Sequence, residues 1–280
     1  EGDRRRDIRV TIVPVGGREA IHMRILTLPE EARDIRVLGF NDHDQERIRR
    51  ALKSPHGLIL VGGPTGAGKT TTLYSLLSLL DLHSSIACSI EDPIEFNMPF
   101  LRQLEVNERY GITMYQGLRT ILRMDPNIIL VGEIRDPESA KTAVHAAAAG
   151  HLVFATIHAH DAASAISALG RLDIPDFLIG DAVKLVIAQN LVRRLCRDCS
   201  RPRPLFPDER KLFETFGVPV PNEVHQAAEC KTCNYYGYRG RLGVFEVAGI
   251  DDNAARVIAE GAEAQKIRQI FRDAGVQTLV

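Results

Sequence analysis

The residues from 62 to 70, GGPTGAGKT, combine glycines, a lysine and a threonine at a spacing that suits phosphate binding. Gly63 is followed by four residues and then by Gly68, Lys69 and Thr70, which is the P-loop pattern. Glycines let backbone N–H groups curl around phosphate oxygens, and the lysine reaches the outer phosphates of a nucleotide. We predict an ATP site here, with the Thr70 hydroxyl on Mg²⁺; a glycine-rich turn without a ligand is the alternative. The predicted contacts are Gly63, Pro64, Thr65, Gly66, Ala67, Gly68, Lys69, Thr70 and Thr71.

Carboxylates follow two apolar runs. Glu133 comes directly after the run NIILVG, and the segment SIEDPIEF supplies Glu91, Asp92 and Glu95. Ligands bind beyond the carboxyl ends of parallel strands, and a carboxylate there is an expected partner of Mg²⁺. Several carboxylates at one strand end repel each other unless a cation or basic groups compensate. We therefore predict a phosphate and magnesium site, with Glu133 as a magnesium ligand; polar turns are the alternative.

Two histidines, His151 and His158, flank the apolar run LVFATI. If this strand ends near the nucleotide, Thr156 and His158 can hydrogen-bond the terminal phosphate or the attacking water. His151 lies at the opposite end of the strand and has less geometric support. Packing or surface positions are the alternative for both histidines.

Four of the five cysteines form the pairs CRDC and CKTC. Two such pairs supply four thiolates with the spacing of a closed, structural zinc site. Redox disulfides are the alternative, and a cytosolic setting disfavours them. The fifth, Cys88, lies in the apolar run IACSI and is most simply a core residue. The predicted zinc ligands are Cys196, Cys199, Cys230 and Cys233.

Apolar strands that alternate with helices are expected to position these residues. Strands apolar on both faces, alternating with helices, indicate a parallel sheet covered by helices, hence an α/β core. Before it, the stretches DIRVTIV, AIHMRIL and DIRVL predict a small antiparallel element, and residues 41–54 a helix capped by Asn41 or Asp42. The expected core strands cover 57–63, 85–90, 127–132 and 151–157, and the expected helices 69–82, 114–124, 137–149 and, near the end of the chain, 262–275.

The bulk composition is that of an ordinary globular protein. Basic side chains number 35 and acidic ones 36, so net charge gives no reason to expect a nucleic-acid binder. No apolar run reaches the roughly 18 to 20 residues that cross a bilayer, and no secretory signal opens the chain, so we expect a cytoplasmic protein. A strand-like pattern begins almost at once without a methionine, and we expect sequence upstream.

These motifs together resemble the secretion ATPase superfamily, whose members drive type II secretion and type IV pilus assembly. SIEDPIEF is similar to the Asp box of that family, GHLVFATIHAHDA to its His box, and NIILVGEIRD to its Walker B strand, which ends in Gly-Glu. LRTILRMDPNIILVGEIRDPESA and IAQNLVRRLC are more specific than the P-loop, and relatives that retract pili lack the four cysteines. The resemblance implies a RecA-like P-loop NTPase core with a parallel sheet (39–190), preceded by a remnant of a small α+β domain and linker (1–38). It implies a tetracysteine zinc-binding subdomain after the core (191–247) and C-terminal helices (248–280).

The resemblance also implies roles for individual residues. Glu95 would activate water and Glu133 would associate with Mg²⁺. The supporting residues carried over from the family are Glu91, Asp92, His151 and His158, together with Arg24 and Arg36 as arginines that reach the nucleotide. For both arginines a surface-charge position is the alternative.

The resemblance further implies a homohexamer peripheral to the inner membrane. It would touch the membrane only through partners: an inner-membrane platform protein and a membrane-anchored cytoplasmic adaptor. Two other functions remain open from the sequence: a ring-shaped nucleic-acid translocase, which the lack of base-stacking aromatic clusters disfavours, and a nucleotide-gated scaffold that rarely hydrolyses ATP.

Overall fold

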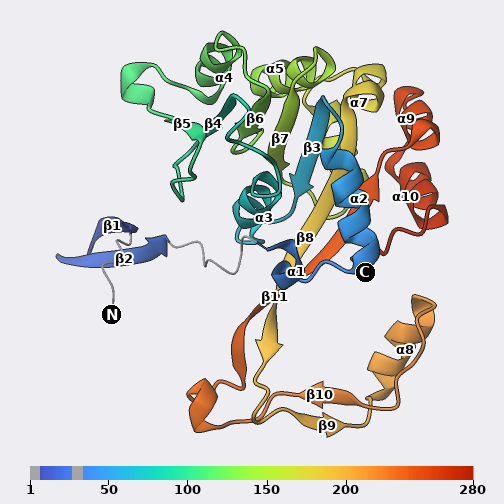
Figure 1. Ribbon diagram of the computed structural model, residues 1–280. Coiled ribbons are helices and arrows are strands. Elements are labelled where there is room, and N and C mark those ends of the chain that lie inside the picture. The colour runs from blue at the N-terminus through green and yellow to red at the C-terminus, as the bar shows by residue number, and fades with distance from the viewer. Residues whose placement is uncertain (1–6, 27–33, 280) are drawn as a thin grey trace.

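The centre of the molecule is a mainly parallel sheet, as a computed structural model describing residues 7–26 and 34–279 shows (Figure 1). Within these residues the large sheet has seven strands in the order β11-β8-β3-β7-β6-β4-β5. The strands from β8 to β5 pair in parallel, and β11 pairs antiparallel with β8 at one edge. The strands are β3 (Gly57–Gly62), β4 (Ala87–Glu91), β5 (Leu101–Glu105), β6 (Ile128–Val131), β7 (Leu152–Ile157), β8 (Val183–Leu195) and β11 (Tyr238–Gly249).

Helices cover both faces of this sheet. Every residue of β3, β4, β6 and β7 is buried, which explains their continuous apolar runs. Alternate residues face opposite ways: Leu58 and Leu60 pack in one core cluster, Ile59 and Val61 in the other. One cluster is covered by α4 (Met114–Leu122), α5 (Pro137–Ala148), α6 (Ala162–Arg171), α7 (Asp176–Ala182), α9 (Asp252–Ala259) and α10 (Ala264–Asp273), the other by α1 (Ile35–Leu38), α2 (Asp42–Leu52) and α3 (Lys69–Leu77).

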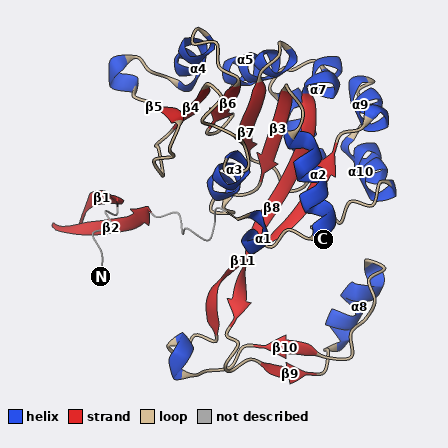
Figure 2. Cartoon of the chain, in the orientation of Figure 1, coloured by secondary structure: helices blue, strands red, loops and turns tan. Residues whose placement is uncertain are grey.

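The two longest strands continue beyond the sheet as a ribbon. β8 and β11 remain paired out to Leu195 and Tyr238, and the ribbon leads to the small strands β9 (Arg201–Arg203) and β10 (Val224–Gln226) and to α8 (Pro207–Thr215) (Figure 2). The register of the ribbon shifts between Tyr238 and Arg241, so two residues of β11 oppose one of β8. One structural element therefore joins the edge of the core to the cysteine-bearing segment.

The described N-terminal part is a hairpin of β1 (Asp7–Val15) and β2 (Arg18–Leu26). Gly16 and Gly17 both have positive φ angles, which a two-residue hairpin turn requires. The antiparallel expectation holds for these two stretches. It is wrong for DIRVL: Asp34 caps a short helix, α1, Ile35 is buried in the core, and Gly39 ends the helix with a left-handed conformation.

The strands and helices expected in the core are present, with shorter bounds. α3 ends at Leu77 rather than residue 82, and Asn41 caps α2 through its side chain. β5, α6 and α7 were not expected. The division at 190/191 and 247/248 stays a prediction; in the structure β8 and β11 run continuously across these positions, and residues 1–6 and 27–33 of the N-terminal part lie outside the described residues. None of the described helices is long and apolar enough to span a membrane.

The contact between α7 and α9 gives a test of this packing. A Cβ at Gly180 would lie 2.5 Å from the Ala255 carbonyl oxygen and 3.0 Å from Ala259 Cβ. We expect Gly180→Ala to lower the free energy of unfolding by about 1–3 kcal/mol, because backbone cannot yield there.

The matched control is Gly170→Ala in α6, where the nearest atom, Asp176 Oδ1, lies 3.8 Å from the added Cβ. This change should raise the free energy of unfolding by up to about 1 kcal/mol through helix propensity. Urea denaturation measures both values, and the same sign for the two variants would contradict the packing described.

Candidate active site and cysteine cluster

A cleft of about 790 Å³ lies where the parallel strands of the core end. The segment after β3 carries the P-loop, Glu133 follows β6, Glu91 ends β4 and His158 follows β7. The carboxyl ends of parallel strands share one edge of a sheet, so this placement is a consequence of the topology. Of the residues predicted from the sequence, the cleft is lined by Pro64, Thr65, Gly66, Ala67, Gly68, Lys69, Thr70, Thr71, Glu91, Asp92, Glu95, Glu133, His158 and Arg24.

The P-loop leaves the N-terminus of α3 open toward the cleft. Gly66 and Gly68 have φ angles of 79° and 87°, and nothing lies within 4 Å of a Cβ at Gly66. Gly68 caps α3 without a side-chain hydrogen bond, whereas side-chain oxygens cap α2, α4, α5 and α6. The uncapped amides and the helix dipole together fit a phosphate group.

Lys69 is folded back over the loop. Its Nζ donates to the carbonyl oxygens of Gly63 at 2.9 Å and Pro64 at 3.3 Å. Partial burial lowers the pKa of Lys69 from its usual value, with Glu133 opposing the shift and Arg135 adding to it. The ammonium group thus lies beside the place where the helix terminus would hold a phosphate.

Gln189 of β8 supports the P-loop from behind and was not identified from the sequence. It is 2% exposed, and its Nε2 donates to the Ala67 carbonyl oxygen at 2.6 Å. A Cβ at Gly63 would lie 2.6 Å from the Gln189 carbonyl oxygen, and one at Gly68 would lie 3.3 Å from its Nε2. The close approach of the β8 backbone therefore excludes a Cβ at Gly63, and the Gln189 side chain leaves little room for one at Gly68.

Glu133 is held between an arginine and a histidine. Arg135 binds its Oε2, with Nε at 2.6 Å, and His158 Nε2 lies 2.7 Å from Oε1. Arg135 also lies 4.0 Å from the exposed Asp92. His158 is thus placed in the cleft beside the predicted magnesium ligand, and Thr156 donates to the Gly132 carbonyl oxygen at 2.6 Å at the same strand end.

The two glutamates of the SIEDPIEF segment differ in surroundings. Glu91 is buried and accepts hydrogen bonds from Tyr74, Ser89 and Gln103. Glu95 is half-buried, lines the cleft and forms no hydrogen bond or ion pair with any residue that the structure describes. Of the two, only Glu95 keeps its carboxylate oxygens free to bind a water molecule.

Arginines outside the P-loop core line the same cleft. Arg24 on β2 lies opposite Arg9 on β1 in the hairpin register, and Arg241 of β11 also reaches the cleft. Arg9 and Arg241 were not identified from the sequence. Arg9 could have been found, because pairing about the Gly16-Gly17 turn places it opposite Arg24, whereas the partner of β11 could not be deduced from local pattern.

The structure does not bring His151 or Arg36 to this cleft. His151 precedes β7 at the far end of the strand, and its Nδ1 lies 2.7 Å from the Pro126 carbonyl oxygen. Arg36 forms an ion pair with Asp34 at 2.6 Å on the surface of α1. A role at the nucleotide for either residue stays a prediction without support from these contacts.

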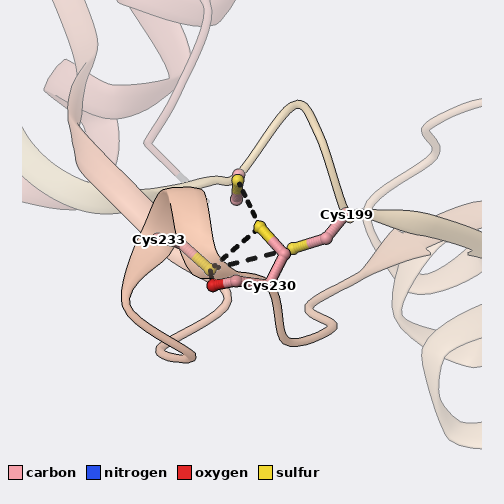
Figure 3. A group of neighbouring side chains, drawn as sticks. Cys199, Cys230 and Cys233 are labelled. Carbon is pink, nitrogen blue, oxygen red and sulfur yellow. Dashed lines mark hydrogen bonds between the residues drawn. The ribbon is translucent and has the colours of Figure 1, made fainter.

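The four cysteines predicted as metal ligands form one cluster at the end of the β8–β11 ribbon. Their sulfur atoms all lie within 4.8 Å of one another, and Cys199, Cys230 and Cys233 point toward a common centre in Figure 3. Gly237 donates its N–H to Cys233 Sγ at 3.2 Å. Although desolvation opposes ionisation, hydrogen bonds lower the pKa of Cys233 to about 6. Cys233 therefore favours the thiolate, the form that binds metal, whereas desolvation and the neighbouring thiols raise the pKa of Cys199 to about 12. The four sulfur donors fit a four-coordinate ion.

Comparison with known proteins gives a consistent family. The family described as Type II/IV secretion system protein matches residues 2–280. The Type II secretion system ATPase E of Vibrio cholerae is 41% identical over 271 residues, which are 97% of this chain and 54% of that protein. The Type IV pilus assembly ATPase PilB of Myxococcus xanthus is 38% identical over 283 residues, covering 99% of this chain and 50% of that protein. This chain thus spans about half the length of these curated relatives.

Solved structures show the same architecture. The pilus retraction motor PilT with bound ADP superposes with a TM-score of 0.66 at 26% identity, covering 95% of this chain and 65% of that chain. The Legionella pneumophila ATPase DotB has a TM-score of 0.63 at 22% identity, covering 95% of this chain and 65% of that chain, and supports the fold alone. The α/β core expected from the sequence is confirmed.

The close approach at Gly63 yields a prediction for the P-loop. Gly63→Ala places a Cβ 2.6 Å from the backbone oxygen of Gln189, so the loop must shift. Strain of about 1–3 kcal/mol would weaken binding of a fluorescent ATP analogue about tenfold or more. Gly249→Ala, where nothing lies within 4 Å, is the control and should bind normally; equal affinity in both variants would refute the proposed constraint.

The cysteine cluster predicts bound metal in the purified protein. We expect a divalent ion in near-stoichiometric amount by elemental analysis, and its loss in Cys196→Ser and Cys233→Ser, because each removes a ligand from a closed set. Cys88→Ser, a buried cysteine outside the cluster, is the control and should keep the ion. Absence of metal from the unmodified chain, or its retention in both ligand variants, would contradict the site.

Proposed function

The chain belongs to the family of type II/IV secretion system proteins, and from this premise we propose that it binds and hydrolyses ATP with Mg²⁺. One observation carries the proposal: the P-loop, the free carboxylate Glu95 and the Glu133–His158 pair line a single cleft. Phosphoryl transfer needs three kinds of group: donors that hold the phosphates, a carboxylate near the attacking water, and cationic groups that offset the developing negative charge.

The cradle binds and orients the nucleotide. The amides at the start of α3 and the Lys69 ammonium group would hold the outer phosphates. To do so, Lys69 would exchange its hydrogen bond to the Gly63 carbonyl oxygen for one to phosphate. Thr70 and Glu133 would hold Mg²⁺, which offsets phosphate charge when bound. Glu133 is fixed for this role by His158 and Arg135, which limit its rotation.

Glu95 is the proposed water-activating residue, with Asp92 in a supporting position. The Glu95 side chain lines the cleft and forms no hydrogen bond or ion pair with the described residues. A carboxylate near the γ-phosphate orients water and accepts its proton as the water oxygen bonds to the γ-phosphorus, while the bond from that phosphorus to the β,γ-bridging oxygen breaks and ADP leaves. His158, beside Glu133, is placed to register whether the terminal phosphate is present.

Arginines would offset the negative charge that develops on the phosphoryl group in the transition state. Arg24, which resembles a nucleotide-contacting arginine of the family, lines the cleft together with Arg9 and Arg241. Since these arginines lie on the hairpin and on the ribbon, their approach would depend on the arrangement of parts outside the sheet. Movement of such parts with the nucleotide state is the proposed route from hydrolysis to mechanical work.

The proposed work is type II protein secretion or type IV pilus assembly. Relatives named for both processes match almost the whole chain. The resemblance drawn from the sequence implies that four such cysteines distinguish assembly and secretion motors from retraction motors, and the chain has this cluster. We propose that the protein acts as a homohexamer in the cytoplasm at the inner membrane. Its proposed partners are a platform protein and a membrane-anchored adaptor. Zinc is the proposed ion of the cysteine cluster, because four thiolates at tetrahedral spacing favour it.

Replacement of Glu95 tests the chemistry. Glu95→Gln keeps the size of the side chain and removes the proton acceptor, so single-turnover hydrolysis of radiolabelled ATP should fall by about 100-fold or more. Binding of the ATP analogue should stay near normal.

Glu214→Gln, the same chemical change on the exposed face of α8, is the control and should leave turnover unaltered. Undiminished hydrolysis by Glu95→Gln would exclude Glu95 as the residue that activates water.

A further inference from the structure

Glu91 is a buried carboxylate, and both of its oxygens accept hydrogen bonds. It is 3% exposed, at the end of β4. Its Oε2 accepts from the Tyr74 hydroxyl, and its Oε1 accepts from Ser89 Oγ at 2.5 Å and from Gln103 Nε2 at 3.0 Å. Three donors satisfy this carboxylate, so neither oxygen is free to take a proton from water.

Tyr74 connects Glu91 to the phosphate cradle. It lies on α3, the helix whose first residue is Lys69, and its ring is almost fully buried. Burial, followed by the charge of Glu91, raises the pKa of Tyr74 well above its usual value, so the hydroxyl keeps its proton and donates. The helix that would bind phosphate is thereby tied to the end of β4.

Gln103 connects Glu91 to the segment that carries Glu95. The Gln103 amide donates to the Phe96 carbonyl oxygen at 2.9 Å and accepts from the Met98 N–H at 2.9 Å. On the other side of Glu95, the Ile94 N–H donates to a second β5 residue, Glu105, at 3.2 Å. The backbone is thus fixed before and after Glu95, while the Glu95 side chain itself has no partner among the described residues.

We propose that Tyr74, Glu91 and Gln103 form a positioning bracket, which sets the place of Glu95 relative to the P-loop. This inference rests on the proposed function of Glu95. It assigns Glu91 a positioning role instead of contact with the reacting atoms, and it adds two residues, Tyr74 and Gln103, that the sequence motifs do not single out. A buried, fully satisfied network suits the task because its members hold one another rigidly.

The bracket predicts a selective loss of rate. Misplacing a catalytic group by about 1 Å can cost up to 100-fold in rate while binding of the nucleotide is unaffected. Tyr74→Phe removes one hydroxyl and keeps the ring, which packs edge-on against the Phe96 ring with the two ring centroids 6.1 Å apart. Gln103→Met keeps the length of the side chain on an edge strand. Neither variant alters the P-loop.

The test compares hydrolysis and binding in the complete chain. We expect kcat of each variant to fall about tenfold or more, with the affinity for the fluorescent ATP analogue unchanged. The kcat of the double variant should be no lower than that of the less active single variant, because both substitutions disrupt the same unit. Hydrogen exchange at the Met98 amide should quicken in Gln103→Met. Tyr110→Phe, which removes a hydroxyl from a side chain that is 81% exposed, is the matched control and should behave as the unmodified chain.

Two results would overturn the bracket: unchanged kcat in both variants, or parallel loss of kcat and affinity together with lowered thermal stability, which marks a purely structural role. If Tyr74→Phe does not fold, Gln103→Met decides the question alone. Glu95→Gln, measured alongside, separates the two hypotheses. Loss of turnover in Glu95→Gln with normal bracket variants refutes only the bracket, whereas retained turnover in Glu95→Gln refutes the role of Glu95 itself.

Discussion

The uncapped N-terminus of α3 is the feature on which the candidate site depends. A helix terminus with free amides is costly to bury unless an anion or water satisfies it, and here it opens into a cleft at the carboxyl edge of a parallel sheet. The turn before it is kept tight by β8, because Gln189 binds the Ala67 carbonyl oxygen and leaves no room for a Cβ at Gly63. The cradle is therefore built by the sheet as much as by the loop.

The same sheet edge distributes charge around that cradle. Glu133 lies between Arg135 and His158, whereas Glu91, at the wall of the cleft, is buried and accepts hydrogen bonds from neutral donors. Glu95 alone of these carboxylates has no partner among the described residues. Such separation of environments assigns different tasks to similar groups. Arginines on the hairpin and the ribbon add positive charge from elements that are not part of the parallel core.

The α/β core could be predicted from the sequence because strands such as LVFATI are apolar on both faces, which only a covered parallel sheet explains. The P-loop was predicted from the spacing of its glycines and lysine, and Glu133 and His158 were predicted to lie near it because each follows an apolar strand; the structure places all three at one cleft. Register between distant segments could not be deduced: nothing local to GYRGRLG says that it pairs with β8 or that Arg241 reaches the cleft. The helix α1 was missed since its alternating residues mimic a strand, and burial of Ile35 decides otherwise. Which carboxylate is free and which is bound depends on Tyr74 and Gln103, two residues without a recognisable motif.

The central claim is that the P-loop and the acidic strand ends meet at one metal–nucleotide complex. Anomalous diffraction from crystals grown with Mn²⁺ and a non-hydrolysable ATP analogue tests it most directly. The account predicts the terminal phosphates on the amides that begin α3 and a metal peak about 2.1 Å from the Thr70 hydroxyl oxygen, on the side of the cleft that holds Glu133. Nucleotide bound elsewhere, or a metal remote from both residues, would contradict it.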